Sequence, residues 1–162
     1  MPGSLKTGFA YKLLILIVAL SGLLLLYRFY PRHATVETVI NGDTLLLENG
    51  TLVKLVGVNT PEANDPEEKV RQFGLAAADF TQNLVEGKEI RIKYYFQPEH
   101  DDEKAPASVY LADGTCLNYE LIKQGYGRAD AESRFGDVKE FLEYERDARE
   151  NKLGLWAEPP GE

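Results

Sequence analysis

Two Asn-Gly pairs, Asn41-Gly42 and Asn49-Gly50, each stand between short runs of apolar and β-forming residues. The runs are ATVETVI (34–40), DTLLLE (43–48) and TLVKLVGV (51–58). Asn-Gly in this setting is the strongest short-range signal for a β-hairpin, because a type I′ turn needs two residues with positive φ. The sequence therefore predicts a three-stranded meander.

The rest of the chain predicts a helix, two strands and two further helices, because apolar residues recur at helical spacing or alternate as in strands. These elements are a helix over 68–86, strands over 88–96 and 107–114, and helices over 117–125 and 135–156. Five strands with a helix between the third and fourth suit a small closed barrel. We therefore expect an α+β fold, in which a five-stranded OB-fold-type β-barrel has three flanking helices.

Residues 9–30 form an apolar run of 22 residues, and its charged members are Lys12 and Arg28, both near the ends. As a helix this run would be about 33 Å long, close to the thickness of a bilayer's hydrocarbon core. We expect a transmembrane helix here, within a membrane anchor over residues 1–33 that precedes the globular domain (34–158) and a disordered tail (159–162). The alternative is a cleaved signal peptide, but the flank YRFYPRHAT lacks a small-residue cleavage site.

The globular part is acidic. Residues 1–33 hold four of the 18 basic residues and none of the 26 acidic ones, so residues 34–162 have a formal charge of 14 − 26 = −12. Such a field is unfavourable for a polyanion unless basic residues cluster. The single cysteine, Cys116, excludes an intrachain disulfide.

Oxygen-bearing side chains gather where the first strands are expected to end. Asp43 follows the first Asn-Gly pair, and Asn59, Thr60 and Glu62 follow the third strand. A hard cation such as calcium binds six to eight oxygen atoms of this kind. The alternative is that these residues serve only the turns.

Five motifs in order, at matching spacing, resemble the thermonuclease family, whose type member is staphylococcal nuclease. They are NGDT (41–44), KLVGVNTPE (54–62), FGLAA (73–77), ADGTCLNYELIKQGYG (112–127) and KLGLW (152–156). The resemblance covers about residues 34–158. It implies a five-stranded barrel with three helices and calcium-dependent hydrolysis of DNA and RNA.

Carried over residue by residue, the resemblance implies a metal site at Asp43, Asn59 and Thr60, and catalytic roles for Glu62, Lys54 and Lys104. Asn59 stands where the family has aspartate, and Lys54 stands where it has arginine. The family's second arginine falls on Lys104 or, with a one-residue shift, on Ala105. Asparagine lacks the negative charge, and lysine cannot make the bidentate contact of a guanidinium, so we expect a weakened calcium site.

Three functions remain open on the sequence. The first is a membrane-anchored, calcium-dependent nuclease that acts on single-stranded DNA or RNA, with activity reduced or altered by the substitutions. The second is a catalytically silent binding or scaffold module of the same fold at the membrane, and the third is a barrel that binds something other than nucleic acid.

Two further expectations concern location and assembly. The family's usual export and the weak charge bias around the apolar run predict a single-pass membrane protein whose globular domain is extracytoplasmic. Nothing in the sequence indicates an oligomer. Other candidates for nucleic-acid contact are the aromatic stripe 94–96, Arg128 and Arg134, which could equally be core or surface residues.

Overall fold

The first hairpin forms where the sequence predicts it, between β1 (Arg32–Asn41) and β2 (Thr44–Leu47). The computed structural model describes residues 4–29, 32–96 and 104–157, with side chains described over 10–23 and from residue 32 onward. Neither Asn41 nor Gly42 has a positive φ, so the expected type I′ turn is wrong. Gly42 is required for space instead, because a Cβ there would lie 2.8 Å from the Cβ of Ala77.

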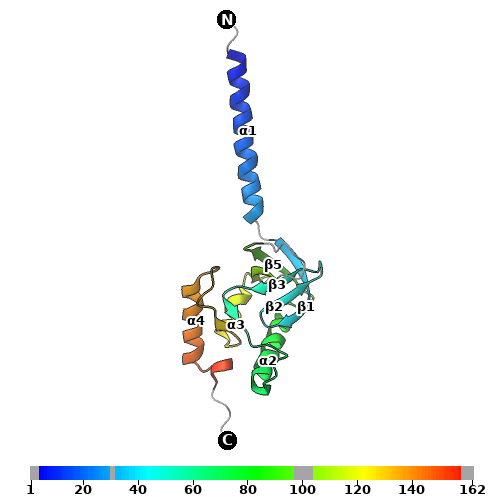
Figure 1. Ribbon diagram of the computed structural model, residues 1–162, viewed down its shortest axis with the longest axis vertical. Coiled ribbons are helices and arrows are strands. Elements are labelled where there is room, and N and C mark those ends of the chain that lie inside the picture. Colours follow the sequence, from blue (N-terminus) through cyan, green and yellow to red (C-terminus); the bar gives the residue numbers. More distant parts are fainter. Residues whose placement is uncertain (1–3, 30–31, 97–103, 158–162) are drawn as a thin grey trace. The chain divides into compact units, whose positions relative to one another are not determined.

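The second hairpin joins β2 to β3 (Leu52–Leu55), and Gly50 in its loop has φ 82°. β1, β2, β3, β6 (Ala105–Tyr110) and β5 (Glu89–Tyr94) then form a closed barrel in that order (Figure 1). All neighbours are antiparallel except β3 and β6, which run parallel. This confirms the predicted five-stranded barrel, whose closure leaves no open sheet edge.

Alternate residues of the strands point into the barrel and form its apolar core. The buried core residues on the strands include Val36, Leu45, Leu47, Val53, Leu55, Ile90, Ile92, Ala107 and Val109. The polar side chain of Asn118 is fully buried beside them. Its amide donates to the carbonyl oxygens of Val56 (2.9 Å) and Ala107 (3.1 Å), and its Oδ1 accepts from the backbone N–H of Val109 (3.0 Å). Asn118 therefore links α3 to β6 and to the residue that follows β3, the two strands that pair in parallel.

Three helices flank the barrel, as predicted. They are α2 (Glu68–Val85), α3 (Leu117–Lys123) and α4 (Val138–Glu150), and a short 3-10 turn, η1 (Gly154–Trp156), follows. The predicted helix over 135–156 is wrong at both ends. It begins late because the Asp137 side chain caps it by accepting from the N–H of Glu140 (3.3 Å), and it ends early because Lys152 and Gly154 have positive φ.

The predicted third strand, 51–58, is interrupted. β3 ends at Leu55, and Gly57, with φ 75°, turns the chain where a Cβ would collide with the ring of Phe141. The strand resumes as β4 (Val58–Asn59), which pairs with β7 (Arg128–Ala129) in a separate two-stranded sheet. The motif residues 59–62 therefore leave from β4 and not directly from the barrel.

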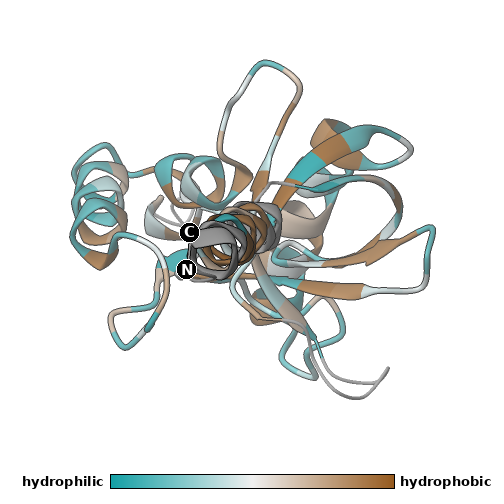
Figure 2. Cartoon of the chain, turned by 90° about the horizontal axis from the view of Figure 1, so that it is seen from above, coloured by the Kyte–Doolittle hydropathy of each residue, from teal (hydrophilic) through white to brown (hydrophobic). Residues whose placement is uncertain are grey.

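The N-terminal unit, residues 1–30, contains one helix, α1 (Ser4–Phe29). Its described residues are mostly apolar (Figure 2), and the side chains of 10–23 are all exposed. Among the described residues, we find no helix with the length and hydropathy that crossing a membrane requires, so the structure does not support the expected span over 9–30. Residue 30 and the side chains of 24–29 lie outside the described part, as does the expected tail over 159–162.

Replacing Asn118 with alanine tests the buried amide. Asn118→Ala removes three buried hydrogen bonds, and we expect the free energy of unfolding to fall by roughly 2–4 kcal/mol in urea denaturation. Asn83 is the matched control, because its amide bonds to Asp79 on the exposed face of α2. Asn83→Ala should change the same free energy by less than about 0.5 kcal/mol. Equal effects from both substitutions would contradict a structural role for Asn118.

Candidate active site

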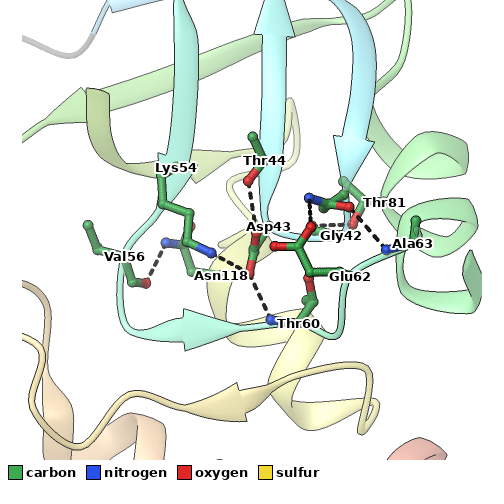
Figure 3. Close-up of polar contacts among 11 residues, drawn as sticks. Gly42, Asp43, Thr44, Lys54, Val56, Thr60, Glu62, Ala63, Thr81 and Asn118 are labelled. Atoms are coloured by element: carbon green, nitrogen blue, oxygen red, sulfur yellow. Dashed lines mark hydrogen bonds and ion pairs between the residues drawn. The ribbon is translucent and has the colours of Figure 1, made fainter. Parts of the chain in front are cut away.

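Asp43 lies in the β1–β2 turn with only 2% of its surface exposed, and its carboxylate is fully engaged (Figure 3). Oδ1 accepts from the hydroxyl of Thr44 at 2.9 Å, and Oδ2 accepts from the backbone N–H of Thr60 at 2.7 Å. The ammonium of Lys54 lies 2.5 Å from Oδ2. A buried carboxylate is costly unless it is paired and hydrogen-bonded, and here both conditions are met.

Lys54 is placed by strand register. It lies opposite Thr44 on β2 and beside Pro106 on β6, and the backbone N–H of Leu55 donates to the carbonyl oxygen of Asp43 (2.8 Å). The Lys54 side chain is 33% exposed, whereas that of Asp43 is 3% exposed. An ammonium has three N–H donors, so Lys54 can bind Asp43 and still present donors to the solvent side.

Glu62 supplies a second carboxylate at the same end of the barrel. It is exposed in the loop after β4, and Oε2 accepts from the Asn41 amide at 3.2 Å. The Asn41 Oδ1 in turn accepts from the backbone N–H of Ala63 (3.2 Å). Figure 3 shows Asp43 between Lys54 and Glu62 in this view. Asn before Gly predicts only a turn, so the contact of Asn41 with Glu62 is not predictable from the sequence.

Helix α2 supports this loop through small residues. A Cβ at Gly74 would collide with the carbonyl of Glu62, so the helix backbone approaches the loop directly. The Thr81 hydroxyl, fully buried, donates to the carbonyl oxygen of Gly42 at 2.7 Å. The FGLAA motif is therefore explained by packing, since Gly74 and Ala77 let α2 approach both loops that hold the two carboxylates. Thr81 was also missed, and no pattern in the sequence separates it from other helix residues.

Asn59 and Thr60, the other expected metal ligands, are placed less favourably for a cation. Asn59 is exposed on β4 opposite Arg128, and it brings no charge. Thr60 is bound to Asp43 through its N–H, and its Oγ1 is buried without a hydrogen-bond partner among the described residues. Arg128 shares a pocket of about 510 Å³ with both residues, and its guanidinium lies over the Trp156 ring at 5.3 Å.

Within the described part of the chain, Lys104 forms no ion pair with Asp43 or Glu62. Lys104 is exposed and lies just before the first residue of β6. By register, Ala105 lies beside Val53, one residue before the Pro106–Lys54 pair, and Ala105 is buried. Among the described residues, the ion pair with Asp43 is made by Lys54, and the role of Lys104 at a phosphate stays a prediction. The 97–103 segment lies outside the described residues.

The aromatic stripe is largely structural. Tyr94 packs against the core, and Tyr95 and Phe96 contact the ring of Phe135 with ring centroids 4.8 and 5.9 Å apart. Arg134, the other basic candidate, is exposed. The contacts that hold Asp43 and Glu62 in the described part of the chain come from other residues.

Comparison with known proteins agrees with this geometry. A family model described as "Staphylococcal nuclease homologue" matches residues 52–158. The chain belongs to the staphylococcal nuclease family. It is 30% identical over 125 residues to a thermonuclease of Staphylococcus intermedius, an alignment that covers 75% of this chain and 74% of the relative.

Two further relatives come from other organisms. The chain is 31% identical over 148 residues to an uncharacterized protein of Methanocaldococcus jannaschii, covering 76% of this chain and 71% of the relative. It is 25% identical over 130 residues to endonuclease YncB of Bacillus subtilis, covering 77% and 62%. The family assignment made on the five motifs is therefore confirmed.

The calcium site that the family resemblance implies does not fit the residues of this chain. Asp43 already accepts from three donors, one of them a cation, and Asn59 is neutral where the family has a carboxylate. Across the described residues, no three acidic, histidine or cysteine side chains converge as a metal-binding group. The hydrogen-bond donors around Asp43 all belong to the chain itself, so its carboxylate is satisfied without an ion.

A double-mutant cycle tests the Asp43–Lys54 pair. Asp43→Asn and Lys54→Met each leave the other residue of the pair without its partner. The double variant should therefore lose less free energy of unfolding than the two single variants together. We expect a coupling free energy of about 1–3 kcal/mol in urea denaturation. The control pair is Lys139 and Glu143, which are 3.8 Å apart with side chains 86% and 49% exposed. Its coupling should stay below about 0.5 kcal/mol. A value that small for Asp43 and Lys54 would show that the pair contributes nothing.

Proposed function

We propose that this protein is a nuclease that hydrolyses phosphodiester bonds of single-stranded DNA or RNA at the end of the barrel that carries Asp43 and Glu62. Membership of the staphylococcal nuclease family supports the reaction class. The observation that carries the proposal is local. An exposed carboxylate, Glu62, accepts a hydrogen bond from Asn41, and a partly exposed ammonium, Lys54, binds Asp43, which lies between the two in Figure 3.

Each group has a step that suits its chemistry. Glu62 takes a proton from a water molecule as that water attacks phosphorus, and the P–O bond to the leaving sugar breaks while its oxygen gains a proton from solvent. Lys54 donates to a non-bridging phosphate oxygen, on which negative charge grows in the transition state. Asn41 is a positioning residue, because it holds one Glu62 oxygen. Asp43, Asn59 and Thr60 offer oxygens to calcium, but since they do not fit it in this arrangement, no step is assigned to that ion.

The charge of the domain affects the conditions for a test. The formal charge of −12 over residues 34–162 opposes a polyanion, and electrostatic binding weakens as salt rises. The proposal therefore expects cleavage to be strongest at low ionic strength. A single strand suits the site better than a duplex, because its exposed bases and flexible backbone can adapt to a small barrel.

Glu62→Gln tests the proposal directly. The full chain, purified in mild detergent, is incubated at low salt with labelled single-stranded DNA and with RNA, with calcium and with chelator. Glu62→Gln should lower the cleavage rate by about 10²–10⁴-fold, because the amide cannot accept the proton. Glu48→Gln is the control, since Glu48 is exposed at the opposite end of β2. Cleavage that survives Glu62→Gln under every condition would contradict the assignment.

A second candidate function is a catalytically silent binding or scaffold module. The observations that favour it are that Asn59 is neutral and that both oxygens of Asp43 already accept from donors of the chain. It predicts that the full chain binds a labelled single strand, measured by fluorescence anisotropy, without cutting it. Cleavage lost in Glu62→Gln would exclude it.

We propose in addition that residues 9–30 hold the protein at a membrane with the globular domain outside the cytoplasm. This proposal rests on the sequence alone, on an apolar run interrupted only by Lys12 and Arg28. Flotation with lipid vesicles should recover the full chain at the lipid layer, whereas a variant with Leu16→Lys and Leu20→Lys should stay below, because each charge within the bilayer is costly. Protease added outside cells that express the protein should digest the globular domain. Recovery of both chains below the lipid would contradict the anchor.

A further inference from the structure

The Asp43 carboxylate has an unusual set of partners for a residue expected to bind a metal. Its side chain is 3% exposed, and Lys54 Nζ, Thr60 N and Thr44 Oγ1 occupy it at 2.5, 2.7 and 2.9 Å. Of these three partners, only Lys54 carries charge. The positive charge that a buried carboxylate requires is therefore supplied from within the chain.

The Lys54 ammonium is held in that place by the barrel. Lys54 lies in register with Thr44, the residue next to Asp43, and the next residue along β3 donates its N–H to the carbonyl oxygen of Asp43. A shift of one residue would turn the Lys54 side chain to the other face of the sheet, into the apolar core. The pairing of β2 with β3 therefore fixes the ammonium beside the carboxylate.

The charges around this pair disfavour a divalent ion. Lys54 cancels the charge of Asp43, Asn59 adds none, and Glu62 is the remaining carboxylate of the motif. Calcium in proteins binds six to eight oxygens, several of them usually charged. An ion approaching Asp43 would have to displace the ammonium or lie against it, and like charges at such distances repel strongly.

We propose that the Lys54 ammonium is a tethered cation that takes the place of a divalent metal at Asp43, so that the site contacts a phosphate group without calcium. The Lys54 side chain is 33% exposed, and an ammonium has three N–H donors, so those not used by Asp43 suit a phosphate oxygen. The part that concerns phosphate rests on the proposed nuclease function. The part that concerns calcium depends only on the Asp43–Lys54 contact.

Calcium titration followed by thermal unfolding tests the tethered cation without any assay of activity. The unfolding midpoint of the wild-type full chain should not change with calcium. Lys54→Met keeps most of the side-chain volume but frees Asp43, so it should gain a calcium-dependent rise of roughly 5–10 °C at a hundredfold excess over Kd. Asp43→Asn added to Lys54→Met should abolish that rise. Lys139→Met, which removes an ammonium on the exposed face of α4, is the control and should remain insensitive.

The outcomes separate this inference from the proposed function. A saturable, calcium-dependent rise of the unfolding midpoint in the wild type, removed by Asp43→Asn, would contradict the tethered cation. A folded Lys54→Met variant whose unfolding midpoint does not rise with calcium would also contradict it. If Lys54→Met does not fold, the wild-type titration still decides. In the cleavage assay, chelator should change the wild-type cleavage rate by less than about twofold. With chelator present, Lys54→Met should cleave about 10²-fold more slowly than the wild type. Absence of any cleavage would contradict the proposed nuclease function but would not affect the conclusion from the calcium titration.

Discussion

The buried carboxylate of Asp43 is the interaction on which the candidate site depends. It binds the β1–β2 turn through Thr44, strand β3 through Lys54 and the loop after β4 through the N–H of Thr60. Three segments that are separated in sequence therefore share one acceptor. Because a buried carboxylate is costly without its partners, the group expected to bind a metal also determines how the strands end.

Helix α2 supplies the second half of this arrangement. Its small residues, Gly74 and Ala77, lie against the Glu62 loop and the Gly42 turn, and Thr81 bonds to the Gly42 carbonyl. Side chains larger than these would push the two loops apart. The distance between the two carboxylates is thus set by how closely a helix can approach a turn, which is a packing property of the whole domain.

Much of the architecture could be predicted because local signals agreed with one another. The hairpins, the order of strands and helices, and α2 over 68–86 follow from Asn-Gly pairs and hydrophobic period. The errors have tertiary causes. The turn at Gly42 is shaped by Ala77, the break at Gly57 by the Phe141 ring, and the paired strands β4 and β7 are too short to show any period.

The sequence by itself determined the family, the closed barrel with three helices and the presence of Asp43, Lys54 and Glu62 at strand ends, because these depend on motifs and on periodicity along the chain. Only the tertiary structure decided what the residues do to one another: that Lys54 neutralises Asp43 and that Asn41 holds Glu62. The physical reason is that a charge has its effect through the groups within a few ångströms of it, and strand register and helix packing choose those groups.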